Sequence, residues 1–135
     1  MLLQNKRVFI VEDDAGSLAV ASSYLRQAGA GIIFSRWGES TAKKILSDMP
    51  IDVILMDLML PRQVSGFDVF TEIRQHPELA NVPIIAVSSM DPDIAMPRAK
   101  AMGFSGFIAK PIYPSITKYV SEVLDGKKVW VGSSL

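Results

Sequence analysis

The stretch IDVILMDLMLPRQVSG, residues 51–66, places a continuous apolar run, Val53 to Met56, directly before Asp57. An uninterrupted apolar run of this length is typical of a strand that is buried on both faces of a parallel sheet. In open α/β sheets, ligands and chemistry lie beyond the carboxyl ends of the strands. Asp57 is therefore the first candidate for a functional residue, although an Asp at this position can also simply end a strand.

Outward from this stretch, short apolar runs with strand composition alternate with segments whose apolar residues recur at helical spacing. Besides 53–56, the predicted strands are residues 7–11, 32–34, 83–87 and 106–109. The predicted helices are about residues 15–28, 39–49, 67–76, 93–102 and 115–124. This alternation predicts βα units with right-handed crossovers. The predicted fold class is α/β: a doubly wound, five-stranded parallel sheet with helices on both faces.

Pro97 falls inside the fourth predicted helix. Within a helix, proline removes a backbone hydrogen bond and costs about 3 kcal/mol unless it occupies the first turn. We therefore expect this helix to begin near Met96 or to be kinked there.

Length and composition limit the classes of protein. The chain has 135 residues, which fits one domain, predicted as 1–125, and a C-terminal tail, 126–135, for which docking and disorder both stay open. The formal net charge is zero and no basic block is present, which argues against direct nucleic-acid binding. No apolar run is long enough to insert into a membrane, and the N-terminus does not read as an export signal. Together with the absence of Cys, this favours a cytoplasmic protein.

Polar side chains follow four of the predicted strands: Glu12, Asp13, Asp57, Ser88 and Lys110. Carboxylates about 4 Å apart repel by about 4 kcal/mol per pair at an effective dielectric of about 20, so an acidic cluster here needs a cation. An all-oxygen site without His or Cys suits Mg²⁺. A carboxylate nucleophile, a lysine and a hydroxyl beside Mg²⁺ are the components of phosphoryl transfer.

Four motifs carry a family resemblance: VFIVEDD, DVILMDLMLP, PIIAVSS and GFIAKP. In this order and spacing, residues 6–125 resemble the receiver domains of two-component response regulators. The resemblance implies a flavodoxin-like fold with strand order 2-1-3-4-5. It implies a stand-alone receiver whose partners are a sensor histidine kinase or a histidine phosphotransfer protein and a downstream protein target. Homodimerisation stays open.

The resemblance also implies roles for single residues. Asp57 is the phosphoacceptor, Lys110 pairs with the phosphoryl group, and Ser88 and Phe107 are switch residues. The Mg²⁺ ligands are an acidic pair, the acceptor and one backbone carbonyl: Glu12, Asp13, Asp57 and Met59. The Lys110–Pro111 peptide is expected to be cis, and output is expected on the face formed by 95–102, Phe107 and the last helix.

The chain departs from the family pattern near the acceptor. The loop from Asp57 to Gly66 is one residue longer than usual, and Val64 and Ser65 replace the usual acidic residue before glycine. Met59 and Met90 lie two residues after Asp57 and Ser88, where neither can orient a water for attack. We therefore expect slow hydrolysis of the phosphoaspartate.

The same residues also bear on three other functions. A nucleotide- or flavin-binding module would need a phosphate loop after the first strand, where the chain has carboxylates instead. A Mg²⁺-dependent hydrolase with an Asp nucleophile would need a second acid or base just after Asp57, and residues 58–60 offer none. A phosphorylation-independent scaffold or binding module stays open. Whether the protein counts as an enzyme also stays open, because a receiver catalyses its own phosphorylation and dephosphorylation but acts mainly as a switch.

Overall fold

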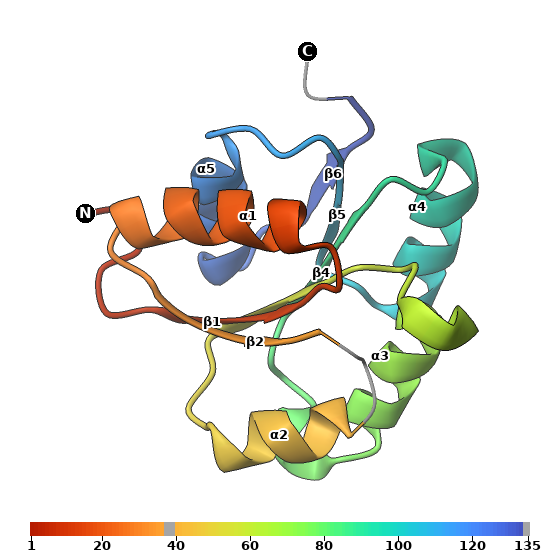
Figure 1. Cartoon of the computed structure of the whole chain (residues 1–135). Coiled ribbons are helices and arrows are strands. Elements are labelled where there is room, and N and C mark those ends of the chain that lie inside the picture. The colour runs from red at the N-terminus through yellow and green to blue at the C-terminus, as the bar shows by residue number, and fades with distance from the viewer. Residues whose placement is uncertain (37–39, 134–135) are drawn as a thin grey trace.

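The computed structural model describes residues 1–36 and 40–133, and within them the chain forms a six-stranded sheet (Figure 1). The strand order is β2-β1-β3-β4-β5-β6, and every neighbouring pair is parallel. The strands are β1 (Arg7–Val11), β2 (Gly31–Ser35), β3 (Val53–Met56), β4 (Ile84–Ser88), β5 (Gly106–Ala109) and β6 (Val129–Val131).

Helices cover both faces of this sheet (Figure 1). One face carries α1 and α5, and the other carries α2, α3 and α4. The helices are α1 (Ala15–Gln27), α2 (Thr41–Ser47), α3 (Gly66–Arg74), α4 (Pro92–Met102) and α5 (Ile116–Leu124), with short 3₁₀ turns at Pro61–Gln63 and Pro77–Leu79. The predicted start of the second helix at Glu39 lies outside the described residues.

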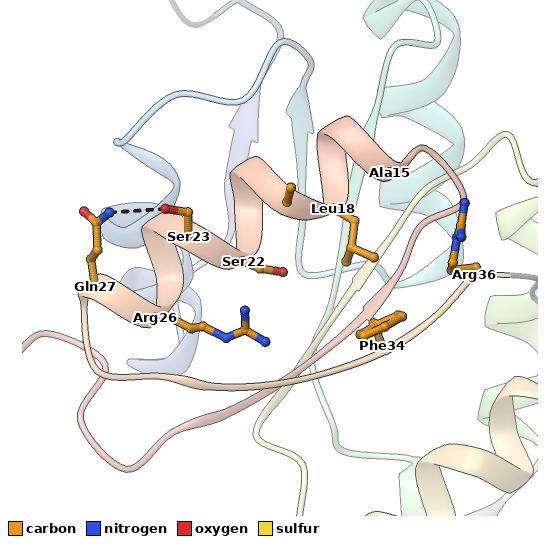
Figure 2. A pocket seen from close by; sticks show the side chains of 9 residues that line it. Ala15, Leu18, Ser22, Ser23, Arg26, Gln27, Phe34 and Arg36 are labelled. Atoms are coloured by element: carbon orange, nitrogen blue, oxygen red, sulfur yellow. Dashed lines mark hydrogen bonds between the residues drawn. The ribbon is translucent and has the colours of Figure 1, made fainter.

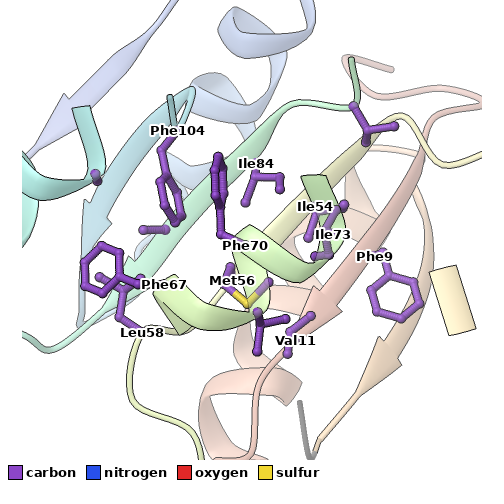
Figure 3. Close-up of a cluster of buried hydrophobic side chains, with 14 of the residues drawn as sticks. Phe9, Val11, Ile54, Met56, Leu58, Phe67, Phe70, Ile73, Ile84 and Phe104 are labelled. Carbon is purple, nitrogen blue, oxygen red and sulfur yellow. The ribbon is translucent and has the colours of Figure 1, made fainter. Parts of the chain in front are cut away.

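The core lies on both sides of β3, whose four residues are all buried. On the side of α2, α3 and α4, the ring of Phe104 stacks on Phe70 at 4.2 Å between centroids and meets the edge of Phe67 at 5.9 Å (Figure 3). On the other side, Leu25 of α1 and Val120 of α5 are completely buried. A central apolar strand covered on both faces fixes the position of the residue that follows it.

The predicted doubly wound parallel sheet, with order 2-1-3-4-5 and helices on both faces, is confirmed. The described residues add a strand to it: Val129–Val131, within the segment predicted as a tail, pairs with β5 as β6. The tail therefore docks at least as far as this strand, and the sheet is one strand wider than the sequence predicts.

The predicted late start of the fourth helix is wrong. The helix α4 begins at Pro92, and the side chain of Asp91 caps it by accepting a hydrogen bond from the Asp93 N–H at 2.9 Å. Proline at the first helical position costs no hydrogen bond. Pro97 lies in the interior of the helix and has no N–H to donate to the carbonyl of Asp93, one turn earlier. Both Pro97 and Asp93 are exposed. Water can satisfy an exposed carbonyl, which keeps the cost of Pro97 low.

Candidate functional site

The predicted site residues lie at the carboxyl edge of the sheet, each fixed by the strand before it. Glu12 follows β1, Asp57 follows β3, Ser88 ends β4, and Lys110 follows β5. Hydrogen bonds continue the strand pairing past these ends: Asp57 N donates to Val11 O at 3.0 Å, and Lys110 N donates to Ser88 O at 3.0 Å. Glu12, Asp57 and Ser88 are buried, with exposed fractions of 4%, 7% and 0%. The parallel register therefore brings residues from distant parts of the chain into one buried cluster.

Lys110 links the two buried carboxylates. Its Nζ lies 3.0 Å from Asp57 Oδ2 and 2.5 Å from Glu12 Oε1. The Lys110–Pro111 peptide is cis, as predicted. Charged hydrogen bonds of this kind are stronger than neutral ones, and the low exposure of all three groups reduces screening by solvent. The cation of Lys110 is therefore held directly beside the carboxylate of Asp57.

The charge of Lys110 does not fully compensate the two carboxylates. The pKa of Glu12 is raised from 4.5 to about 7, first because burial disfavours the charged form, and then because the Asp57 carboxylate hydrogen-bonds to Glu12 and repels its charge. Burial lowers the pKa of Lys110, but the nearby carboxylates of Glu12 and Asp57 outweigh it and the net shift is upward. Burial and the neighbouring Asp57 carboxylate thus both disfavour the charged form of Glu12. A cation bound beside these two carboxylates would offset both effects.

Within residues 1–36 and 40–133, no group of three or more Asp, Glu, His or Cys side chains gathers closely enough to hold a metal ion. The structure thus brings Glu12 and Asp57 together but leaves the Asp13 side chain outside a three-carboxylate cluster. The backbone carbonyl of Asp13 accepts a hydrogen bond from Arg36 Nη2 at 3.1 Å. The donor set present is all oxygen and acidic, which fits a hard cation such as Mg²⁺.

Two predicted residues shape the acceptor end. The N–H of Met59 donates to Asp57 Oδ1 at 3.2 Å, and its side chain is 50% exposed. The N–H of Met90 donates to the hydroxyl of Ser88 at 3.2 Å, and Met90 is half-buried. Asp57 thus accepts hydrogen bonds from Met59 through one oxygen and from Lys110 through the other.

The loop after Asp57 contains a residue whose role the sequence reasoning missed. A Cβ on Gly66 would lie 2.2 Å from the Asp57 backbone oxygen and 2.8 Å from Leu58 Cα, far inside normal contact. Gly66 therefore allows the first turn of α3 to pack against the acceptor. Ser65, which replaces the usual acidic residue, caps α3 by accepting from the N–H of Phe67 at 3.1 Å. In the sequence, this role could have been inferred from a glycine that directly precedes a predicted helix, at the end of the long loop.

Phe107 lies in the middle of β5 and is completely buried. It belongs to the core on the α4 side of the sheet, and in the β5–β6 register it lies opposite Trp130. The predicted switch aromatic is therefore directed into the core in this structure.

An open groove lies between α1 and β2, apart from the cluster of Glu12, Asp57 and Lys110 (Figure 2). Its volume is about 580 Å³, and its lining includes Leu18, Arg26 and Phe34. On its rim, Gln27 Nε2 donates to Ser23 Oγ at 3.2 Å. None of the predicted site residues lines this groove, so its size does not make it the site of chemistry.

Comparisons with known proteins show the family to which this chain is similar. The family described as "Response regulator receiver domain" matches residues 8–120. The polar-differentiation response regulator DivK of Brucella ovis is 30% identical over 118 residues, which are 87% of this chain and 93% of DivK. The uncharacterised transcriptional regulatory protein YcbL of Bacillus subtilis is 31% identical over 102 residues, 76% of this chain and 43% of YcbL. The chain spans about half the length of the Bacillus subtilis regulators that it matches.

A solved structure supports the fold. The receiver domain of the sensor histidine kinase PA1611 of Pseudomonas aeruginosa, which has a magnesium ion coordinated in its active-site cleft, superposes with a TM-score of 0.77. The two chains are 24% identical, and the match covers 90% of this chain and 98% of that domain. In the described part of the chain, no helix is long and apolar enough to cross a membrane.

Proposed function

The chain belongs to the receiver domain family of response regulators, and we propose that it accepts a phosphoryl group on Asp57 and thereby switches its contacts with other proteins. The donor is a phosphohistidine of a sensor histidine kinase or of a histidine phosphotransfer protein. The predicted cytoplasmic location and stand-alone architecture stay predictions.

One observation carries the proposal. The carboxylate of Asp57 is buried at the end of the central strand, with the Lys110 ammonium 3.0 Å from one of its oxygens. In phosphoryl transfer, catalysis comes mainly from positioning and from neutralising charge on the phosphoryl oxygens. A strand end that holds a nucleophile beside a fixed cation supplies both.

Transfer of the phosphoryl group from phosphohistidine to Asp57 needs no third reactant. A carboxylate oxygen of Asp57 attacks phosphorus, an O–P bond forms, and the P–N bond to the donor imidazole breaks. The electron pair of that bond leaves with the ring nitrogen, and the protonated imidazole becomes neutral. Lys110 pairs with the phosphoryl oxygens, and the hydroxyl of Ser88 can donate to one of them.

The reaction is proposed to need Mg²⁺. The residues that would hold the ion are Glu12, Asp13, Asp57 and the backbone carbonyl of Met59. The two buried carboxylates of Glu12 and Asp57 support this assignment, because the single charge of Lys110 beside them leaves one negative charge for a further cation to compensate. When bound, the ion neutralises charge on the phosphoryl group.

Intact-mass analysis tests the proposal. After incubation with acetyl phosphate and Mg²⁺, we expect the protein to gain one phosphoryl unit of about 80 Da through covalent catalysis, and we expect no gain in EDTA. The matched control is Asp57→Asn, which keeps the size of the side chain and should gain none. Normal labelling of this variant would show that another residue accepts the phosphate.

A second candidate function is a binding module that works without phosphate. One observation favours it. We expect a phosphate-driven switch to draw the ring of Phe107 inward, but Phe107 is already completely buried in this structure. A chain that lacks any mass gain with acetyl phosphate but still folds and binds a partner would support this alternative.

A further inference from the structure

The strand β6 lies outside the residues that match the receiver family, which end at 120. It runs parallel to β5, with Val129 opposite Gly106 and Trp130 opposite Phe107. The N–H of Val129 donates to Ser105 O at 3.2 Å. Figure 1 shows β6 at the edge of the sheet beyond β5. We call residues 129–132 the C-terminal strap.

The C-terminal strap is packed on both of its faces. Val129 is 6% exposed and joins the core beneath α1 and α5. On the opposite face, Trp130 packs against the core that contains Phe107, and Lys100 Nζ of α4 lies 5.0 Å from the centre of its ring. A cation over an aromatic face contributes a specific attraction in addition to packing. The strap therefore ties the edge of β5 to α4.

The end of the strap passes closely over the start of α4. A Cβ at Gly132 would lie 3.3 Å from Met96 Cε and 3.4 Å from Pro92 Cβ. The strap thus meets α4 at two places, near its first turn and at Lys100.

The edge of β5 is shaped to receive this strand. A Cβ at Gly106 would lie 2.6 Å from the backbone oxygen of Val129 and 2.7 Å from its Cγ2, whereas real Cβ atoms do not approach closer than 3.0 Å. Relief would require β6 to move, because one of the two atoms belongs to its backbone. The strap therefore docks only because residue 106 has no side chain.

We propose that the edge of β5 together with α4 forms a strand-docking surface, and that the C-terminal strap occupies it in cis and keeps Phe107 buried. A partner that uses this surface must displace the strap. The partner that fits is an extended segment that adds parallel to β5, as partner strands do at other sheet edges. Its pattern is apolar, aromatic, apolar, so that its aromatic ring reaches Lys100.

The strap is well suited to reversible displacement. It has three residues in strand conformation, and Trp130 and Val131 are only partly buried. Short, partly exposed elements open locally at a lower free energy than the whole domain. A tethered strand competes at an effective concentration of about millimolar, so a partner strand has to bind well to replace it.

The first test uses the full chain without phosphate. Trp37 is replaced by Phe, which leaves Trp130 as the single tryptophan. Gly106→Ala is compared with Gly31→Ala, which changes the first residue of β2 and meets only Lys6 O at 3.9 Å. We expect Gly106→Ala to shift Trp130 emission to the red, to raise its quenching by acrylamide at least twofold, and to speed amide exchange in β5 at least tenfold. Gly31→Ala should match the parent.

The second test asks whether the vacated surface binds a strand in trans. The probe is a dye-labelled peptide of residues 127–133, KKVWVGS, followed by fluorescence anisotropy. The variant Val129→Ser with Trp130→Ala weakens the cis strand but leaves β5 and α4 intact. We expect it to bind the peptide at least tenfold more tightly than the wild type, and the addition of Gly106→Ala should abolish binding.

Several results would overturn the proposal. One is acrylamide quenching of Trp130 that is the same in Gly106→Ala as in the parent. Another is a peptide affinity that is the same in the wild type, the double variant and the triple variant, or binding that is absent from all three. If the double variant does not fold, Lys100→Ala replaces it, and acrylamide quenching of Trp130 is measured without peptide. Quenching about twofold higher than in the parent supports the proposal, and quenching equal to or lower than in the parent counts against it. Because neither test needs phosphate, a failure of Asp57 phosphorylation leaves these results unaffected.

Discussion

The raised pKa of Glu12 predicts that the proposed binding of Mg²⁺ depends on pH near neutrality. With a pKa of about 7, about 90% of Glu12 is protonated at pH 6 and about 10% at pH 8. Because a metal ion binds the deprotonated carboxylate, the dissociation constant for Mg²⁺ should rise about tenfold between pH 8 and pH 6. Isothermal titration calorimetry across this range measures the change directly.

The same pKa predicts the opposite trend for stability without metal. The folded state holds the Glu12 proton more strongly than the unfolded state, so this contribution is fully present below pH 4.5 and is lost as pH rises toward 7. A shift of this size corresponds to at most about 3 kcal/mol in the free energy of unfolding. Urea unfolding in EDTA should therefore show a loss of stability from pH 5 to pH 8, and added Mg²⁺ should reverse it.

Two variants control this prediction. Glu12→Gln keeps the size of the side chain but cannot titrate, so its Mg²⁺ affinity should be weaker than that of the wild type at pH 8 and nearly independent of pH. Glu78→Gln, which changes an exposed carboxylate away from the site, should behave like the wild type. A pH-independent wild-type affinity, or an unchanged slope in Glu12→Gln, would refute the reasoning.

Three further changes test the site. Lys110→Ala removes the ammonium beside Asp57, so the protein should accept phosphate more slowly and, once phosphorylated, should lack the change in amide exchange around Phe107; an unaltered change would contradict the role of Lys110. Met59→Asn should speed dephosphorylation severalfold, because an amide can orient an attacking water; an equal or slower rate, measured by loss of the 80 Da adduct, would count against shielding. Gly66→Ala should lower the free energy of unfolding by about 1–3 kcal/mol, because its Cβ would meet the Asp57 backbone oxygen at 2.2 Å; a urea midpoint equal to that of the wild type would show that the loop adapts freely.

The sequence predicted those parts of the fold that depend on local pattern. The apolar run before Asp57 and its neighbours identified the strands because both faces of such strands are covered. The site residues could be placed because parallel strands end at one edge, where Glu12, Asp57 and Lys110 do meet. Asp13 shows the limit: sequence places it beside Glu12, but side-chain direction decides whether it joins the cluster.

Features that depend on tertiary contacts were not predictable in this way. The average cost of an internal proline suggested a late start for α4, yet the cost depends on whether Pro97 faces water, which only the packed structure shows. Docking of Val129–Val131 depends on the missing side chain of Gly106, more than twenty residues earlier. Neither residue carries a local signal for the other, so the sequence left this docking open.

The sixth strand also has a consequence for solubility. All four residues of β5 are buried, and an apolar strand of this kind at a bare edge is a template for intermolecular sheet growth. Here the edge ends instead in a three-residue strand that follows Lys127 and Lys128, and short strands beside lysines are poor templates. We therefore expect β6 to protect the chain from aggregation, and we expect sequence changes that loosen it to lower colloidal stability even where the rest of the fold is intact.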